Sequence, residues 1–300
     1  MEKLVIKTEG LSKNYGRRLG ISDVDMEVFA GEIFGYLGPN GAGKTTTIRI
    51  MMDFISADSG KVEIFGRNAH QHGAEVRRRM GFLPGELNLY ENLSGRELLL
   101  YFCHLRGNGQ WPFIEELASR FQCSLSQPIH TLSHGNKRKI GLIQAFMHKP
   151  DLIILDEPTN GLDPIMQHEF YRLLGEAKAA GQTIFFSSHN LPEVERVCDR
   201  VGIIRAGKMV ATERVSALKT RTMRNVEIHF GEDIGAETFS AIENLRILSL
   251  DKRRLKCQIK GELDQLLKAA ARFKINDFIS REPDLEEIFL AYYGDEGHAQ

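Results

Sequence analysis

The stretch that decides the fold is Gly38-Pro39-Asn40-Gly41-Ala42-Gly43-Lys44-Thr45. It follows an apolar run, Ile33 to Leu37, and precedes residues Thr45 to Phe54, where apolar side chains recur at helical spacing. A GxxxxGK[ST] loop between a strand and a helix is the arrangement in which backbone N–H groups surround phosphate groups. Glycine suits this loop because a Cβ would obstruct the inward turn of the backbone. The stretch therefore predicts a phosphate site at a strand-to-helix turn.

Two side chains of the loop have expected chemical roles. Lys44 is expected to place its ammonium against the β- and γ-phosphates, and the Thr45 hydroxyl to ligate Mg²⁺. The helix that begins at Thr45 adds the positive end of its dipole. The predicted phosphate-binding positions are Gly38, Pro39, Asn40, Gly41, Ala42, Gly43, Lys44, Thr45 and Thr46.

Acidic and histidine side chains follow two further apolar runs. The run Leu152 to Leu155 leads directly into Asp156 and Glu157, and the run Thr183 to Phe186 leads to His189. Open α/β sheets bind ligands at the carboxyl ends of their strands. We therefore expect Asp156 to hold the metal, Glu157 to polarise the attacking water, and His189 to reach the γ-phosphate or fix that water.

Composition restricts the class of protein. The chain has 300 residues, 42% of them hydrophobic and 26% charged, which fits one large α/β domain with a small appendix. The formal net charge of -1 argues against nucleic acid as a partner, and basic runs such as 137–139 are expected to be solvated. No apolar stretch approaches the ~18–20 residues that cross a bilayer. The four cysteines show no CxxC spacing, which is typical of a reducing compartment.

The pattern of apolar residues changes along the chain. Up to about residue 220 it predicts an α/β core with a helical subdomain inserted at about 86–147. Residues 221–300 show alternating strands and predict a small α+β domain of the ferredoxin-like order β-α-β-β-α-β. The helices expected there are 233–245 and 262–273, and a last helix is expected over 284–293.

Further motifs resemble one family of phosphate-loop proteins. The stretch Leu132 to Lys139, LSHGNKRK, resembles the LSGGQ signature of ATP-binding-cassette proteins. The stretch LIILDEPTNGLDP, with Gly161-Leu162-Asp163, resembles the strand and D-loop of that family, and Leu11 to Gly16 resembles the stretch that bears its adenine-stacking aromatic residue. The resemblance covers about residues 3 to 220. The NKxD segment by which GTPases read guanine is absent from the sequence.

The resemblance implies a fold, ligands and a partner. It implies a RecA-like phosphate-loop core with an antiparallel β edge, binding ATP and Mg²⁺, with Tyr15 stacking on adenine. Two cassettes of the family pair head to tail, so Ser133 and Gly135 are expected to contact the γ-phosphate of ATP held by the partner, beside Asp163. One phosphate loop is present, so a second cassette, expected to be a second copy of this chain, supplies the other half.

Three positions depart from the family pattern. The signature has His134 and Asn136 where a glycine and a glutamine are usual, while Ser133 and Gly135 are retained. Gly85 stands where many members have a metal-binding glutamine. Glu86 or solvent is the hypothesised substitute.

The resemblance also implies a role in transport. Glu282 to Phe289 resembles the ending of bacterial cassette subunits that serve exporters with separately encoded membrane subunits. The expected function is therefore ATP hydrolysis that powers export through separate permease subunits, at the inner face of the cell membrane. A soluble cassette ATPase with a non-membrane partner is the alternative. A degenerate binding module is disfavoured because Lys44, Glu157 and His189 are all present.

Overall fold

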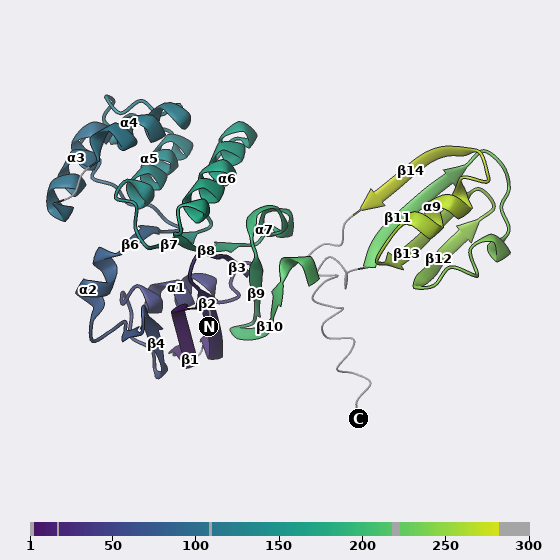
Figure 1. The fold of residues 1–300 in the computed structure, drawn as a ribbon, viewed down its shortest axis with the longest axis horizontal. Coiled ribbons are helices and arrows are strands. Elements are labelled where there is room, and N and C mark those ends of the chain that lie inside the picture. Colours follow the sequence, from purple (N-terminus) through teal and green to yellow (C-terminus); the bar gives the residue numbers. More distant parts are fainter. Residues whose placement is uncertain (1–2, 17, 108–109, 218–222, 282–300) are drawn as a thin grey trace. The chain divides into compact units, whose positions relative to one another are not determined.

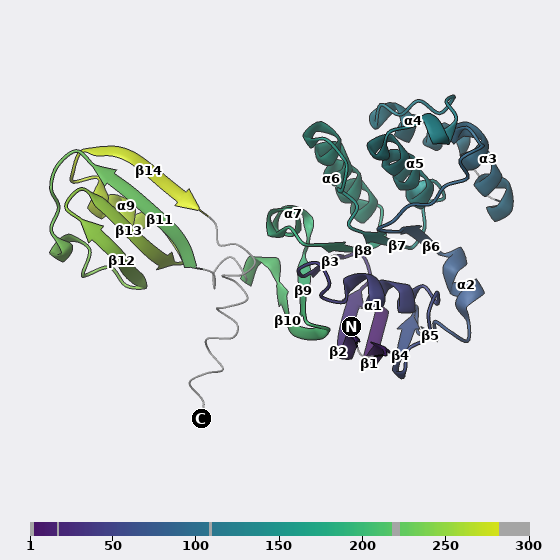
Figure 2. The ribbon, with the colours of Figure 1, turned by 180° about the vertical axis from the view of Figure 1, so that it is seen from behind.

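A computed structural model describes residues 3–16, 18–107, 110–217 and 223–281 (Figures 1 and 2). The chain divides into two compact units, Met1–Glu213 and Arg214–Gln300. Each unit has its own hydrophobic core. The last helix expected from the sequence, 284–293, lies outside the described residues.

A six-stranded sheet forms the centre of the first unit, in the order β10-β9-β3-β8-β7-β6. Its strands are β3 (Ile33–Leu37), β6 (Met80–Leu83), β7 (Leu152–Asp156), β8 (Thr183–Ser188), β9 (Arg200–Arg205) and β10 (Lys208–Arg214). Strands β9, β3, β8, β7 and β6 pair in parallel. Every residue of β3, β7 and β8 is buried, which explains why their sequences are apolar runs without alternation.

A second, antiparallel sheet covers one face of this centre in the order β2-β1-β4-β5. Its strands are β1 (Leu4–Tyr15), β2 (Arg18–Phe29), β4 (Ser59–Ile64) and β5 (Arg67–Asn68). Helix α1 (Lys44–Met51) lies between the two sheets, and Ile48 and Met51 join the core that both share. The antiparallel edge expected for the core is present.

Helices gather on the other side of the parallel sheet (Figures 1 and 2). They are α3 (Gly95–Arg106), α4 (Trp111–Arg120), the 3₁₀ helix η1 (Ile129–Thr131), α5 (His134–Phe146) and α6 (Pro164–Ala179). Two short helices, α2 (Gly73–Arg78) and α7 (Leu191–Val197), complete the unit. Between β6 and β7 the chain is helical, as the sequence predicts for the inserted segment.

Gly81 brings α5 close to the parallel sheet. A Cβ at this position of β6 would lie 2.0 Å from the carbonyl oxygen of Ala145 on α5 and 2.9 Å from Pro150. The first neighbour is a backbone oxygen and the second a carbon of the proline ring, and neither can rotate out of the way. Glycine is therefore required where the helix carrying the signature-like sequence packs on the sheet.

In its described residues the second unit has a four-stranded antiparallel sheet in the order β12-β13-β11-β14, against which helix α9 packs. Its elements are β11 (Met223–Phe230), the 3₁₀ helix η2 (Ala236–Thr238), β12 (Leu245–Asp251), β13 (Arg254–Lys260), α9 (Asp264–Ala270) and β14 (Ile275–Arg281). The alternation that the sequence shows at 226–230 and 255–259 places those apolar side chains in the core.

The prediction of a helix over 233–245 is wrong. Only the single turn η2 forms there, and Ile234 and Phe239 enter the core from an irregular segment. Their separation of five residues does not place them on one face of a helix. Gly235 also lies between them, and glycine disfavours a helix interior.

Two glycine variants test the packing of α5 on the sheet. Gly81→Ala should lower the free energy of unfolding by about 1–3 kcal/mol, because the added methyl group overlaps backbone. The matched variant Gly175→Ala, in an exposed interior turn of α6 with open space around it, should raise it by about 0.5–1 kcal/mol. Urea titrations followed by fluorescence of Trp111, the one tryptophan of the chain, report on the first unit. A neutral Gly81→Ala would contradict the close approach.

Candidate functional site

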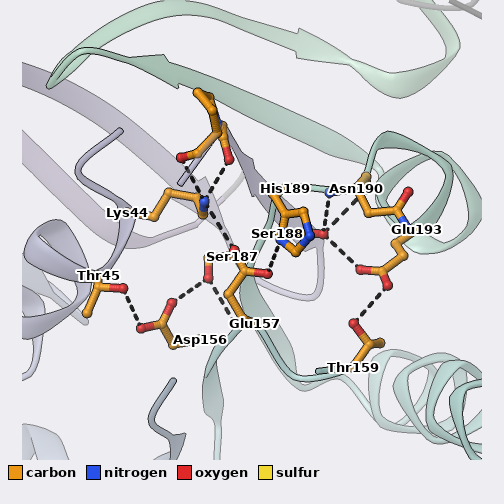
Figure 3. Close-up of polar contacts among 12 residues, drawn as sticks. Lys44, Thr45, Asp156, Glu157, Thr159, Ser187, Ser188, His189, Asn190 and Glu193 are labelled. Carbon is orange, nitrogen blue, oxygen red and sulfur yellow. Dashed lines mark hydrogen bonds and ion pairs between the residues drawn. The ribbon is translucent and has the colours of Figure 1, made fainter. Parts of the chain in front are cut away.

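Three strand ends of the parallel sheet meet at the candidate site (Figure 3). In the register of the sheet Leu37 of β3 lies opposite Ser188 of β8, and Asp156 of β7 lies opposite Ser187. Strand β3 is flanked by β8 on one side and β9 on the other, although neither is next to it in the sequence. The strand order therefore changes direction at β3, and open parallel sheets hold their ligands at such a topological switch point. The structure thus brings the phosphate loop, the paired carboxylates and His189 to one edge.

The phosphate loop adopts a backbone that requires glycine. Gly41 and Gly43 have φ angles of 79° and 109°, in the left-handed region. At Gly38 a Cβ would lie 2.3 Å from the carbonyl oxygen of Ile204 on the neighbouring strand β9. Gly43 is the N-cap of α1 and provides no side-chain cap, so the first N–H groups of the helix remain available to an anion.

Lys44 is held over this loop. Its side chain is buried, and Nζ donates to the carbonyl oxygens of Gly38 at 2.6 Å and Pro39 at 3.2 Å. Nζ also lies 3.1 Å from Oε1 of Glu157. That oxygen is buried and receives no aligned hydrogen bond in the part of the chain that is described. A buried acceptor without an aligned donor is costly in a folded protein, and this oxygen retains the capacity to accept a proton.

The oxygens expected to bind metal adjoin the loop. The Thr45 hydroxyl donates to Oδ2 of Asp156 at 2.8 Å, and the Ser187 hydroxyl donates to Oδ1 of the same carboxylate at 2.6 Å. Hydroxyl and carboxylate oxygens suit Mg²⁺, which keeps several waters and takes phosphate oxygens as further ligands. The described residues hold no group of three or more His, Cys, Asp or Glu arranged for a metal. The donor set therefore fits Mg²⁺ bound together with nucleotide.

Glu157 has an unusual backbone conformation beside His189. Its φ angle of 50° lies in the left-handed region, which is uncommon for a residue with a side chain. Its N–H donates to the Ser187 hydroxyl at 3.0 Å, and its Oε2 lies 2.7 Å from Nδ1 of His189. The turn at Glu157 points its carboxylate toward Lys44 and His189, while the preceding carboxylate, of Asp156, points toward Thr45 (Figure 3).

A buried network supports the loop that carries His189. Ser188 accepts from the Asn190 N–H at 2.9 Å and donates to Glu193 at 2.8 Å. The other oxygen of Glu193 accepts from Thr159 at 2.8 Å. These bonds connect the end of β8 and α7 to the segment after β7, next to the contact between Glu157 and His189 (Figure 3).

Arg138 is a buried residue beside the site whose place the sequence pattern did not reveal. It belongs to a basic run predicted to be solvated, yet Arg138 is 1% exposed and Lys139 is also buried, so the prediction is wrong for both. The helical spacing of Arg138 with Leu142 and Ala145, both buried on α5, is the signal that indicates its burial. Burial lowers the pKa of Arg138 to about 10, while the Asp156 and Glu157 carboxylates oppose that shift.

The remaining predicted residues form two further groups. Tyr15 is half exposed at the end of β1, and Gly20 lies between its ring and Gly43 of the phosphate loop. Ser133 is the N-cap of α5 and Asp163 is the N-cap of α6. A Cβ on Gly135 would lie 2.6 Å from the carbonyl oxygen of Gly161, so signature and D-loop lie against each other.

The structure also locates the three departures from the family pattern. The His134 ring lies against Gly161, with Cδ2 2.8 Å from a Cβ built there, and Asn136 donates its N–H to Ser133 at 3.3 Å. At Gly85 a Cβ would lie 3.0 Å from Oδ2 of Asp156. A side chain at this position would thus reach the predicted metal site. The side chain of Glu86 is exposed, and its role as a substitute ligand stays a hypothesis.

Comparisons with known proteins agree with this arrangement. The family described as "ABC transporter" matches residues 21–160. The bacitracin transport ATP-binding protein BcrA of Bacillus licheniformis is 39% identical over 76% of this chain and 76% of its own. The Nod factor export ATP-binding protein I of Rhizobium johnstonii is 32% identical over 99% of this chain and 97% of its own.

A solved ATP-binding subunit of an ABC transporter is 30% identical, with a TM-score of 0.67, over 72% of this chain and 92% of its own. A phosphate loop at a topological switch point, followed by a signature and a D-loop, defines an ABC cassette. With these relatives, the chain belongs to the family of ATP-binding subunits of ABC transporters.

Ser187 offers a test of this geometry, because its hydroxyl donates to Asp156 and accepts from the Glu157 N–H. Ser187→Ala should lower the rate of Mg²⁺-dependent ATP hydrolysis about 10–100-fold, as loss of an outer-shell contact does. Binding of a fluorescent ATP analogue without Mg²⁺ should change little. Ser124→Ala, at an exposed serine outside the site, is the matched control. Equal hydrolysis rates in both variants would contradict the assigned role.

Proposed function

We propose that this chain hydrolyses ATP with Mg²⁺, as the motor subunit of an exporter whose membrane-spanning subunits are separate chains. The observation that carries the hydrolytic proposal is the position of the Glu157 carboxylate. One of its oxygens faces Lys44 at 3.1 Å and the other faces His189 at 2.7 Å. A carboxylate between the lysine of a phosphate loop and a histidine supports Glu157 as the base for the water that attacks a γ-phosphate.

The residues of the chain divide the work of hydrolysis. Glu157 accepts a proton from water while the water oxygen attacks the γ-phosphorus and the bond to the β,γ-bridging oxygen breaks. The ammonium of Lys44 and the N–H groups at the start of α1 neutralise the phosphate charge that develops. His189 holds Glu157 through Nδ1 and presents Nε2 to the γ-phosphate. Thr45 and Asp156 would hold Mg²⁺, which when bound would supply polarisation of the phosphate oxygens.

Other residues are proposed to bind the adenine ring and to complete the site of a second cassette. Tyr15, half exposed beside Gly20, stacks on adenine. Ser133, Gly135 and Asp163 contact the ATP held by a second copy; within one chain Gly135 of the signature lies against Gly161 of the D-loop, two residues before Asp163. The α5 helix then directs its N-terminal dipole at the partner's γ-phosphate.

A variant that binds but does not hydrolyse ATP tests the pairing of two copies. Glu157→Gln should lower the hydrolysis rate at least ~10²-fold, because the base is lost. With ATP and Mg²⁺ it should run as a dimer in size-exclusion chromatography with light scattering. The double variant Glu157→Gln with Gly135→Glu should stay monomeric, because the added side chain blocks the signature. A monomeric Glu157→Gln at high protein and ATP concentrations would refute head-to-tail pairing.

Two features support the transport role. The relatives over most of the chain are named for bacitracin transport and for Nod factor export. None of the described helices is long and apolar enough to span a bilayer, so a spanning path is assigned to other chains. Export at the inner face of the cell membrane is proposed from these relatives. A soluble ATPase with a non-membrane partner is the second candidate.

Exposed aromatic rings support a docking surface for the membrane partner between the sheet and the inserted helices. Phe54 is 56% exposed and contacts Phe82 of β6 edge to face at 5.5 Å. Tyr90 is 60% exposed and contacts Tyr101 of α3 at 6.1 Å. Exposed aromatics are enriched at protein interfaces. The segment 85–97, where docking is proposed from the family resemblance, includes Tyr90.

Purification from the native host tests the partner. A tagged chain solubilised in mild detergent should co-purify a protein with several predicted membrane spans. The double variant Phe54→Ser with Tyr90→Ser should lose that protein and retain basal ATPase activity. Ile165→Ser, at a 71% exposed apolar residue of α6, is the matched control and should retain it. Recovery of soluble partners alone would leave the ATPase proposal intact and favour the second candidate.

The second unit is proposed as an accessory domain of the ferredoxin-like kind, with the domain boundary near residue 220. Its strand order supports this, although the first helix of that fold is reduced to η2.

A further inference from the structure

The guanidinium of Arg138 lies at the centre of the carbonyl groups behind the catalytic edge. Nη2 donates to the carbonyl oxygens of Asp156 at 2.6 Å and Glu157 at 2.5 Å, and Nε donates to that of Pro158 at 3.4 Å. Nη1 donates to the carbonyl oxygens of Pro84 at 2.6 Å and Gly85 at 3.1 Å. One side chain thus binds two segments, the one after β6 and the one after β7.

A cation buried in this way is costly and needs a compensating role. Arg138 is 1% exposed, and the partners of its guanidinium are carbonyl oxygens rather than a carboxylate. An apolar side chain would fill the same space without the loss of hydration. It would, however, remove the guanidinium donors from the carbonyls of residues 156–158, of which only that of Glu157 has another printed donor, the Asn160 N–H at 3.2 Å. Arginine alone among the side chains presents five N–H donors in one rigid plane.

The conformation of Glu157 depends on these bonds. Its φ angle of 50° is unfavourable for a residue with a Cβ and persists only when neighbours hold it. The Ser187 hydroxyl holds its N–H and Arg138 holds its carbonyl. The peptide groups before and after the Glu157 Cα are therefore both held, the second also by the Asn160 N–H at 3.2 Å, and with them the direction in which the carboxylate projects.

We propose that Arg138 is a positioning residue for ATP hydrolysis, which fixes the backbone at Glu157 and connects the signature helix to it. Arg138 lies on α5, five residues after Ser133 at the N-cap of that helix. Ser133, which is expected to meet the partner's ATP, and the backbone of Glu157 are thereby joined through about one and a half helical turns and one guanidinium. This inference rests on the proposed ATPase function and assigns a positioning role within the same site.

The same bonds reach the position at which the family pattern is broken. Gly85 lacks the side chain by which many members bind the metal, yet its carbonyl is held by Nη1 of Arg138. Its Cα lies close to the Asp156 carboxylate, because a Cβ there would be 3.0 Å from Oδ2. Arg138 thus holds residues 84–85, which lead to the proposed docking surface, close to the Asp156 carboxylate proposed to bind the metal.

The variant Arg138→Lys tests the proposal. Lysine keeps the charge but cannot span two segments from a single nitrogen. We expect kcat per nucleotide-binding subunit to fall about 10–100-fold, as for other outer-shell contacts, with the Kd for a fluorescent ATP analogue changed less than about threefold. In the Glu157→Gln background the variant should still dimerise in ATP. The matched control Arg106→Lys, which loses a carbonyl contact to Met80 outside the site, should keep the wild-type kcat.

Chemical rescue separates positioning from general stability. In Arg138→Ala, guanidinium ion at concentrations far below those that unfold proteins should restore part of kcat, and sodium chloride at equal ionic strength should not. Unchanged kcat in Arg138→Lys, or equal losses in Arg138→Lys and Arg106→Lys, would overturn the positioning role. If the wild-type chain itself lacks Mg²⁺-dependent hydrolysis, the proposed function fails and takes this inference with it.

Discussion

Parallel pairing of β3, β7 and β8 is the constraint on which the site depends. The register sets Leu37, Asp156 and the serines 187 and 188 at one edge, although Leu37 is more than a hundred positions from the others in the sequence. Buried backbone groups must pair, so strands with no exposed residue leave little freedom to slip. The phosphate loop, the two carboxylates and His189 are thereby brought together by the sheet rather than by their own side chains.

A second constraint lies in the adjacent carboxylates after β7. Neighbouring side chains of an extended strand point to opposite faces of the sheet. Two carboxylates that shared one site would repel each other. The left-handed turn at Glu157 directs its carboxylate toward Lys44 and His189, while the Asp156 carboxylate meets hydroxyl groups. Ser187 takes part on both sides, donating to one residue and accepting from the other. Backbone geometry thus gives different surroundings to the two neighbouring residues that are proposed for metal binding and water activation.

The helical segment between β6 and β7 joins the site through close packing. Glycine at position 81 admits α5 to the sheet, and Arg138 reaches from that helix into the carbonyls behind the carboxylates. The exposed rings of Phe54 and Tyr90 contact β6 and α3, the elements at which this segment begins. A partner that moves the segment would therefore act on rigid contacts, because close-packed interiors transmit displacement rather than absorb it.

Much of the site was predictable from local sequence because its parts are local. The phosphate loop needs glycines, a lysine and a threonine in a fixed order, and Asp156-Glu157 follows a recognisable apolar strand, so the sequence alone identifies both. The role of Arg138 was not predictable, since a basic run on a helix looks solvated until the facing strands are known. The helix predicted at 233–245 failed for a related reason: the core of the second unit draws in Ile234 and Phe239 from an irregular segment. The sequence by itself determined the chemistry of the phosphate site, because residue types at short spacing suffice for it. Only the tertiary structure decided which buried charge supports that chemistry, because burial depends on neighbours distant in the chain.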